Sequence, residues 1–212
     1  MVAALASEAR ALRPSTPLLA VSGIGRVAAD AAARRLIDAG ATALIAFGLA
    51  GGLDPALKSG SVVIPREVIS ADGIRYLAHQ AWRERVAAAI SSLRAVNEGA
   101  MLTSAHAINT AADKAAAFRA TGAAAVDMES AAIAAVAADH ELPFIAVRVI
   151  VDTAADRLPR AVVAASRAGG LQFGRLIAGL AAAPGDIAAL MQLAQRYCIA
   201  MRSLRAIGAH LA

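Results

Sequence analysis

The chain has 212 residues, which is enough for one domain with a sizeable core. Apolar residues make up 58% of it and charged residues only 17%, so we expect another subunit or a lipid to cover part of the surface. The net charge of +5 suits phosphate or anionic lipid, but no basic run is interleaved with aromatic residues, which argues against nucleic acid. No charge-free run of about twenty apolar residues is present, which argues against a membrane-spanning helix. The single Cys198 cannot form an internal disulfide, and this fits a cytoplasmic location.

Apolar runs bounded by turn residues predict strands, and helical patterns lie between them. The predicted strands cover residues 2–5, 18–21, 43–47, 61–65, 100–103, 123–126 and 144–151. The predicted helices cover residues 27–39, 81–96, 111–120 and 129–140. The mostly alternating order predicts an α/β fold of three layers, α/β/α, around a central sheet that is mixed but mostly parallel. Continuously apolar strands suit a sheet that is covered on both faces.

The predicted strands stop before residue 158, and residues 158–212 form a predicted helical C-terminal tail of a single domain, residues 1–212. Pro184-Gly185-Asp186 divides this tail into residues 160–183 and 187–211. The second part places Leu190, Tyr197, Leu204 and other apolar side chains on one face. Such a helix could dock on the sheet, join a dimer or lie on a membrane surface.

Two acidic clusters follow predicted strands. Asp127-Met128-Glu129-Ser130 stands where the strand at 123–126 meets a helix, and Asp152 closes the apolar run 144–151. A strand, a helix and a strand in that distance predict one βαβ crossover with two neighbouring parallel strands. Both clusters would then lie at the edge where open α/β sheets bind ligands, which indicates acid–base chemistry on a small molecule. For either cluster alone, a helix N-cap or a solvated strand end is the structural alternative.

Two glycine-rich segments also follow predicted strands, at residues 22–28 and 48–52. Glycines there let the backbone approach a ligand, and the amides at a helix start attract anions; a pair of tight turns is the structural alternative. The string G-I-G-R-V-A satisfies a dinucleotide-binding pattern, but the next predicted strand ends in F-G-L-A-G-G. The acid that would hold a ribose at that strand end is missing, which disfavours a dinucleotide site.

Two further polar residues follow strands. Glu8 follows the first strand and could be a helix-start acid or a third catalytic carboxylate, while His106 follows the strand at 100–103 and could line a pocket. The other histidines form no metal-ligand spacing with acids or cysteine, so a metal site is not expected.

Taken together, these elements resemble the nucleoside phosphorylase/nucleosidase superfamily, which includes methylthioadenosine/S-adenosylhomocysteine nucleosidase and the purine nucleoside phosphorylases. Glu8, S-G-I-G-R-V-A-A at 22–29, G-L-A-G-G-L at 48–53, V-D-M-E-S at 126–130 and I-V-D at 150–152 follow the order found in the family. The Ala/Arg-rich body, with A-D-G-I-R-Y at 71–76 and A-W-R at 81–83, most resembles the hopanoid-biosynthesis-associated phosphorylase branch. The resemblance implies the three-layer phosphorylase/hydrolase-like fold.

The resemblance also implies a site that cleaves a purine N-glycosidic bond without a cofactor, with phosphate as a candidate co-substrate. Asp152 would protonate or hydrogen-bond purine N7, Glu129 would hold the ribose hydroxyls, and Glu8 would position or activate the nucleophile. Met128 would pack on the apolar face of the ribose. The other predicted substrate-binding residues are Asp127, Gly48, Gly51, Ile108 and His106, and the predicted phosphate-binding residues are Gly25, Arg26 and Arg10.

Three positions depart from the family pattern. Leu49 stands where the family commonly has Ser near the nucleophile, and Asp127 replaces the usual Glu of the nucleosidases. Ala107 stands where those enzymes stack an aromatic ring on the base, so the base site would be more open or closed by a partner chain. Glu8 favours water as the nucleophile, whereas the hopanoid branch implies phosphate, and the sequence leaves both open.

We therefore predict release of adenine from a 5′-substituted adenosine such as adenosylhopane, with phosphate as the nucleophile. The first alternative is a nucleosidase for methylthioadenosine or S-adenosylhomocysteine that uses water. Alternatives from other classes are a non-catalytic nucleoside-binding protein and a dinucleotide-dependent oxidoreductase. We expect a cytoplasmic homodimer, in peripheral contact with the inner membrane through its C-terminal helices.

Overall fold

The computed structural model describes residues 1–12, 18–159 and 187–211. Its helices are α1 (Ala6–Ala9), α2 (Arg26–Asp38), α3 (Gln80–Ile90), α4 (Ala111–Thr121), α5 (Ser130–Asp139) and α8 (Ile187–Gly208). Its strands are β1 (Val2–Ala3), β2 (Ala20–Val21), β3 (Leu44–Gly52), β4 (Val62–Val63), β5 (Glu67–Ile69), β6 (Arg75–Leu77), β7 (Val96–Asn97), β8 (Met101–Thr103), β9 (Ala125–Asp127) and β10 (Phe144–Ile150). The predicted helix over 160–183 and the break at 184–186 lie outside the described residues.

All the described strands belong to one mixed sheet, with the order β6-β5-β8-β9-β3-β10-β4-β7 and with β1 and β2 attached beside β3. Six of the nine strand pairings are parallel, and only β10–β4, β3–β9 and β5–β6 are antiparallel. The prediction of a mixed, mostly parallel sheet is therefore confirmed.

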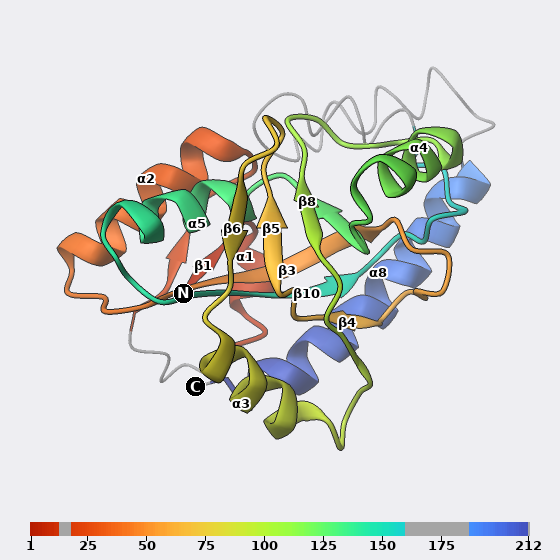
Figure 1. The fold of residues 1–212 in the computed structure, drawn as a ribbon. Helices are drawn as coiled ribbons and strands as arrows, with labels where there is room; N and C mark the ends of the chain where they lie inside the picture. The colour runs from red at the N-terminus through yellow and green to blue at the C-terminus, as the bar shows by residue number, and fades with distance from the viewer. Residues whose placement is uncertain (13–17, 160–186, 212) are drawn as a thin grey trace.

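Helices cover both faces of this sheet, so the three-layer prediction is also confirmed (Figure 1). Successive residues of β3 point to opposite faces: Leu44 and Ala46 join the core beneath α2 and α5, whereas Ile45 and Phe47 join the core beneath α8. The contacts between α2 and α5 are made largely by alanines, whose small side chains let the two helices approach closely. This packing explains how a core can be filled with so few aromatic residues.

The predicted crossover between the two acidic clusters is wrong. β9 and β10 are not neighbours, because β3 lies between them, and β9 runs antiparallel to β3 while β10 runs parallel to it. The acids still converge, since both flanking strands pair with the same end of β3. Gly51 pairs with Val126 on one side, and Ala50 pairs with Ile150 on the other.

Three elements differ from the sequence prediction in extent. β3 continues through residues 48–52, beyond the strand predicted over 43–47, because Gly51 and Gly52 pair with β9; the tight turn given as the structural alternative does not form there. Residues 67–77 form a β5–β6 hairpin that was not predicted, closed by a turn in which Ser70 accepts a hydrogen bond from the Ile74 amide. The helix expected over 81–96 ends at Ile90, and its last expected residue, Val96, begins β7 instead.

α8 docks on the sheet, one of the three uses that its amphipathic pattern allowed. Ala200, Met201, Leu204 and Ile207 are buried against β3 and β10. In the described part of the chain, no helix is both long and apolar enough to cross a membrane.

Candidate active site

A cavity of about 510 Å³ lies where β3, β9 and the two residues after β10, Val151 and Asp152, meet. Helix α8 forms one of its walls. Its lining includes eight residues for which the sequence predicted a role: Glu8, Gly51, His106, Ile108, Asp127, Met128, Glu129 and Asp152. The other four predicted residues, Gly48, Gly25, Arg26 and Arg10, do not line it. The structure therefore gathers the acids and the apolar contacts, but not the predicted phosphate-binding set.

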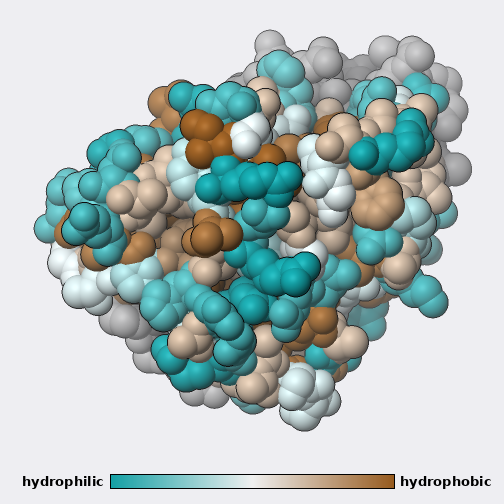
Figure 2. All heavy atoms as spheres, in the orientation of Figure 1, coloured by the Kyte–Doolittle hydropathy of each residue, from teal (hydrophilic) through white to brown (hydrophobic). Residues whose placement is uncertain are grey.

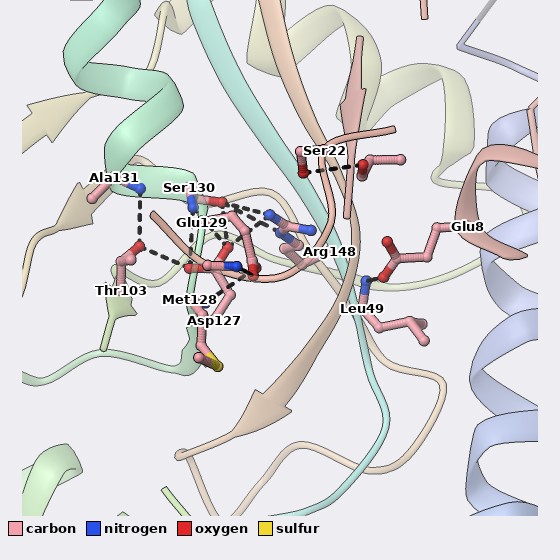
Figure 3. A network of polar contacts seen from close by, with 12 residues as sticks. Glu8, Ser22, Leu49, Thr103, Asp127, Met128, Glu129, Ser130, Ala131 and Arg148 are labelled. Carbon is pink, nitrogen blue, oxygen red and sulfur yellow. Dashed lines mark hydrogen bonds and ion pairs between the residues drawn. The ribbon is translucent and has the colours of Figure 1, made fainter. Parts of the chain in front are cut away.

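Glu8 is held at the start of α1 with only 2% of its surface exposed. Its Oε2 accepts a hydrogen bond from the Leu5 amide at 2.8 Å, and its Oε1 accepts one from the Leu49 amide at 2.9 Å (Figure 3). Burial raises the pKa of Glu8, while the positive charge of Arg148 and the backbone hydrogen bonds oppose that shift. The carboxyl group is thus fixed between two segments that lie far apart in the sequence.

Gly48 separates Glu8 from Arg148. A Cβ atom at this position would lie 2.6 Å from Glu8 Oε1 and 2.7 Å from Arg148 Nη1, which is closer than real Cβ atoms approach such groups. Any larger residue would displace the acid, the guanidinium or both. Gly48 serves the site through the space it leaves, although it does not line the cavity.

Asp127 forms a wholly buried ion pair with Arg148 of β10, at 2.7 Å and with both side chains 1% exposed. The same carboxylate accepts hydrogen bonds from Thr103 Oγ1 and from the amide and hydroxyl of Ser130 (Figure 3). Arg148 in turn donates to Ser130 Oγ at 2.9 Å. Because protein groups occupy its oxygens, Asp127 fixes Arg148 and the start of α5. Its hydrogen bond from the Ser130 amide at the start of α5 corresponds to the helix-capping role given above as the structural alternative.

Glu129 is also buried, and it faces the cavity. Its Oε1 accepts a hydrogen bond from the Gly25 amide at 2.8 Å, and its Oε2 accepts a longer one from the Met128 amide at 3.3 Å. Burial and then the neighbouring negative charge of Asp127 raise the pKa of Glu129 to about 7, against the opposing charge of Arg148. Around neutral pH this carboxyl group can therefore both accept and donate hydrogen bonds.

Asp152 also lines the cavity, just after β10, and it is paired with Lys114 of α4. Lys114 has no exposed surface, and its ammonium group also donates to the Thr153 carbonyl at 2.7 Å. Thr110 caps the start of α4 by accepting a hydrogen bond from the Asp113 amide, which fixes the first turn that carries the lysine. The pairing places a buried cation directly behind the predicted leaving-group acid.

The predicted phosphate-binding residues do not form a site in the cavity. Arg10 and Arg26 are exposed, and the Gly25 amide is already bound to Glu129. Of the described cations, Arg148 approaches Glu8 most directly, with Gly48 between them.

The rest of the cavity is apolar. Ala107 and Ile108 form part of the wall beside Val126 and Met128, so the position without an aromatic ring does face the cavity. α8 contributes Leu190, Leu193, Ala194, Tyr197 and Cys198. The site thus has a polar end around the acids and an apolar wall supplied by the C-terminal helix.

Sequence reasoning missed Arg148 and Lys114. A signal for Arg148 existed, because it is the one charge inside the apolar run 144–151, and a charge in a buried strand needs a partner. Lys114 carried no comparable signal, since a lysine in the first turns of a helix is ordinarily solvated.

Comparisons with known proteins agree with this geometry. The model of the phosphorylase superfamily matches residues 13–181, and no curated protein sequence matches. The fold is similar to that of 5′-methylthioadenosine/S-adenosylhomocysteine nucleosidase from Neisseria meningitidis, with a TM-score of 0.68 and 22% identity over 96% of both chains. The nucleosidase from Helicobacter pylori also gives 0.68, with 16% identity over 84% of this chain and 92% of that one. Futalosine hydrolase from H. pylori gives 0.68 with 15% identity over 92% and 95%.

Proposed function

The chain belongs to the phosphorylase superfamily, and from that premise we propose that it cleaves the N-glycosidic bond of a 5′-substituted adenosine and releases adenine. The observation that carries the proposal is the single cavity shared by Glu8, Glu129 and Asp152, with Arg148 behind it. These groups come from three separate places in the fold: α1, the junction of β9 and α5, and β10 with the segment that follows it. Their convergence is difficult to explain by helix capping alone.

The charges suit the electronic course of the reaction. Breaking the bond between C1′ and N9 develops positive charge on the ribose and negative charge on the base. Three buried acids, Glu8, Asp127 and Glu129, surround one buried cation, Arg148, so the ribose end is favourable for positive charge. Asp152, which lines the same cavity and has no hydrogen bond to the three other acids, would give a proton to N7, which makes the base a better leaving group.

We propose phosphate as the first nucleophile to test, because the chain resembles the hopanoid-associated phosphorylase branch. Water is the second candidate, and a specific observation favours it. Glu8 and Arg148 nearly meet across Gly48, while Arg10 and Arg26 do not line the cavity. Glu8 lines the cavity, and a carboxylate there can orient a water molecule for attack on C1′.

We propose an apolar 5′ group, such as the triterpenoid of adenosylhopane, because α8 lines the cavity with Leu190, Leu193 and Ala194. A methylthio or homocysteinyl group is the alternative. The solved nucleosidases with a similar fold act on such substrates according to their names.

The test is adenine release from several 5′-substituted adenosines, with and without phosphate. Phosphorolysis requires phosphate and yields the ribose 1-phosphate, whereas hydrolysis needs none and yields the free ribose. We expect Asp152→Asn to lower kcat by about a thousandfold while nucleoside affinity survives. An unchanged rate in that variant, for every adenosyl substrate that the wild-type chain cleaves, would contradict the mechanism.

The homodimer, the cytoplasmic location and the peripheral membrane contact remain predictions. Large apolar side chains that are exposed in the single chain support a further partner: Val27 is 83% exposed and Leu77 is 78% exposed. On the face of the molecule drawn in Figure 2, hydrophobic residues are scattered among hydrophilic ones. Liposome co-sedimentation of the intact chain and of a chain truncated at Ala183 tests the membrane contact, and binding by neither would exclude it.

A further inference from the structure

The ammonium group of Lys114 is fully buried, and the chemistry proposed above does not use it. It has no exposed surface, although it stands on α4 among small and apolar neighbours such as Ala117 and Phe118. Removing an ammonium group from water is costly unless it is paired and hydrogen-bonded. An apolar residue could occupy the same place without the free-energy cost of desolvating a charge, so the presence of a lysine there needs an explanation.

Both hydrogen-bond partners of Lys114 belong to the segment that carries the leaving-group acid. Its Nζ bonds to Asp152 Oδ2 and, at 2.7 Å, to the Thr153 carbonyl. In the described part of the chain no hydrogen bond reaches Asp152 Oδ1. Gly51 lies against this carboxylate: a Cβ atom there would lie 3.1 Å from Oδ2 and 3.5 Å from Oδ1, so the glycine leaves the space that the carboxylate occupies.

The second partner of Lys114 is itself fixed. The Thr153 amide and hydroxyl both donate to Asp156 Oδ2, at 2.7 and 2.8 Å, and Asp156 is paired with Arg196 of α8. The carbonyl of Thr153 is therefore held in place by protein groups, and it locates Lys114 independently of Asp152.

We propose that Lys114 is a positioning residue for Asp152. It holds Oδ2, so that Oδ1 is presented to N7 of the leaving base, and its charge stabilises the carboxylate that remains after the proton has moved. In that step the C1′–N9 bond breaks, its electron pair goes to the base, and the Asp152 proton goes to N7, while the nucleophile, phosphate or water, forms the new bond to C1′. The base leaves neutral, and Lys114 keeps its own proton. This inference rests on the proposed adenine release.

The alternative is that Lys114 only ties α4 to the loop after β10. The two explanations differ in one measurable respect. A residue that acts through Asp152 has nothing left to act on once Asp152 is replaced, whereas a purely structural residue still matters.

The experiment is a double-mutant cycle on adenine release from the best 5′-substituted adenosine, using the wild-type chain, Lys114→Met, Asp152→Asn and the double variant. We expect Lys114→Met to lower kcat by about 100-fold in the wild-type background, with KM changed by less than about threefold. In the Asp152→Asn background the same substitution changes kcat by less than about threefold. Lys58→Met, at the only other lysine, which is exposed, is the matched control and leaves kcat unchanged.

Equal losses in both backgrounds would overturn the inference. If Lys114→Met does not fold, Lys114→Arg and Lys114→Gln decide: the arginine retains kcat within about tenfold and the neutral glutamine does not. Equal activity of those two variants would also overturn it. A wild-type chain that releases no adenine would overturn the proposed function, and this inference with it. An active wild-type chain without coupling between the two residues overturns the inference alone.

Discussion

At the scale of single residues, the chemistry of the site depends on an excess of buried acids. Glu8, Asp127 and Glu129 face one buried guanidinium, that of Arg148. Asp127 pairs directly with Arg148. The charge of Arg148 therefore only partly offsets the rise in the pKa of Glu129 that its burial and its negative neighbours cause. The raised pKa of Glu129, about 7, records this imbalance.

This imbalance predicts how stability depends on pH. Between about 4.5 and about 7 the folded chain keeps a proton on Glu129 that the unfolded chain has lost, so its contribution falls as pH rises through that range. Glu129→Gln cannot ionise. We expect it to unfold with the same free energy as the wild-type chain below pH 4.5, and to be more stable at pH 8 by on the order of 3 kcal/mol. Urea denaturation at several pH values measures the difference.

Glu84→Gln, at an exposed position, is the control for that series and should track the wild-type chain at every pH. A Glu129→Gln chain that is no more stable than the wild-type chain at pH 8 would show that ionising the buried Glu129 carboxyl group does not lower the free energy of unfolding. The same variant should lose activity, since an amide cannot hold the ribose hydroxyls as a carboxylate does. Stability and catalysis would then oppose each other at one residue.

The acids were predictable from the sequence, but the buried cations were not. Glu8 and Asp152 each follow an apolar strand, and that local pattern marks the edge of a sheet. The roles of Lys114 and Arg148 depend on their ion-pair partners, Asp152 and Asp127, which lie 38 and 21 residues away along the chain (152 − 114 and 148 − 127). Short-range patterns contain no such information.

At the scale of elements, the Asp127–Arg148 pair connects β9, the first turn of α5 and the middle of β10. Ser130 joins it through its amide and hydroxyl, so one buried network holds three elements in register. This network orients Glu129, which stands between Asp127 and Ser130 in the sequence.

Asp127→Asn should therefore be strongly destabilising. The substitution removes the carboxylate that pairs directly with the buried Arg148, and breaking a buried pair in this way costs about 3–5 kcal/mol. Thermal and urea denaturation measure the loss. Asp30→Asn breaks an exposed pair with Arg34 and should leave the denaturation midpoint unchanged. A small effect of Asp127→Asn would mean that the network is solvated or dispensable.

The limits of sequence reasoning are also visible at this scale. The helices α2, α4 and α5 and most strands were located because each has its own periodicity. The neighbours of β9 were not, because local spacing could not show that β3 is long enough to pair with both β9 and β10. The βαβ expectation failed for this reason, although the acids met as predicted.

At the scale of the whole molecule, three layers place the cavity between the sheet and the C-terminal helix. The two apolar clusters on the faces of β3 hold the sheet rigid, and α8 completes the wall of the cavity. The acids thus stand on the most buried part of the fold, whereas the apolar wall comes from its last described element.

The ion pair between Arg196 and Asp156 has a consequence for how long a ligand stays bound. It fastens α8 to the segment after Asp152, and both side chains remain partly exposed, at 22% and 15%. Dissolved ions screen such a pair, so raising the salt concentration from about 0.05 to about 0.5 M should shorten the residence time of a non-cleavable nucleoside by about two- to fivefold. Arg196→Met should show the short residence time at both concentrations, as measured by stopped-flow dissociation. A residence time that ignores salt in the wild-type chain would mean that ligands leave without loosening α8.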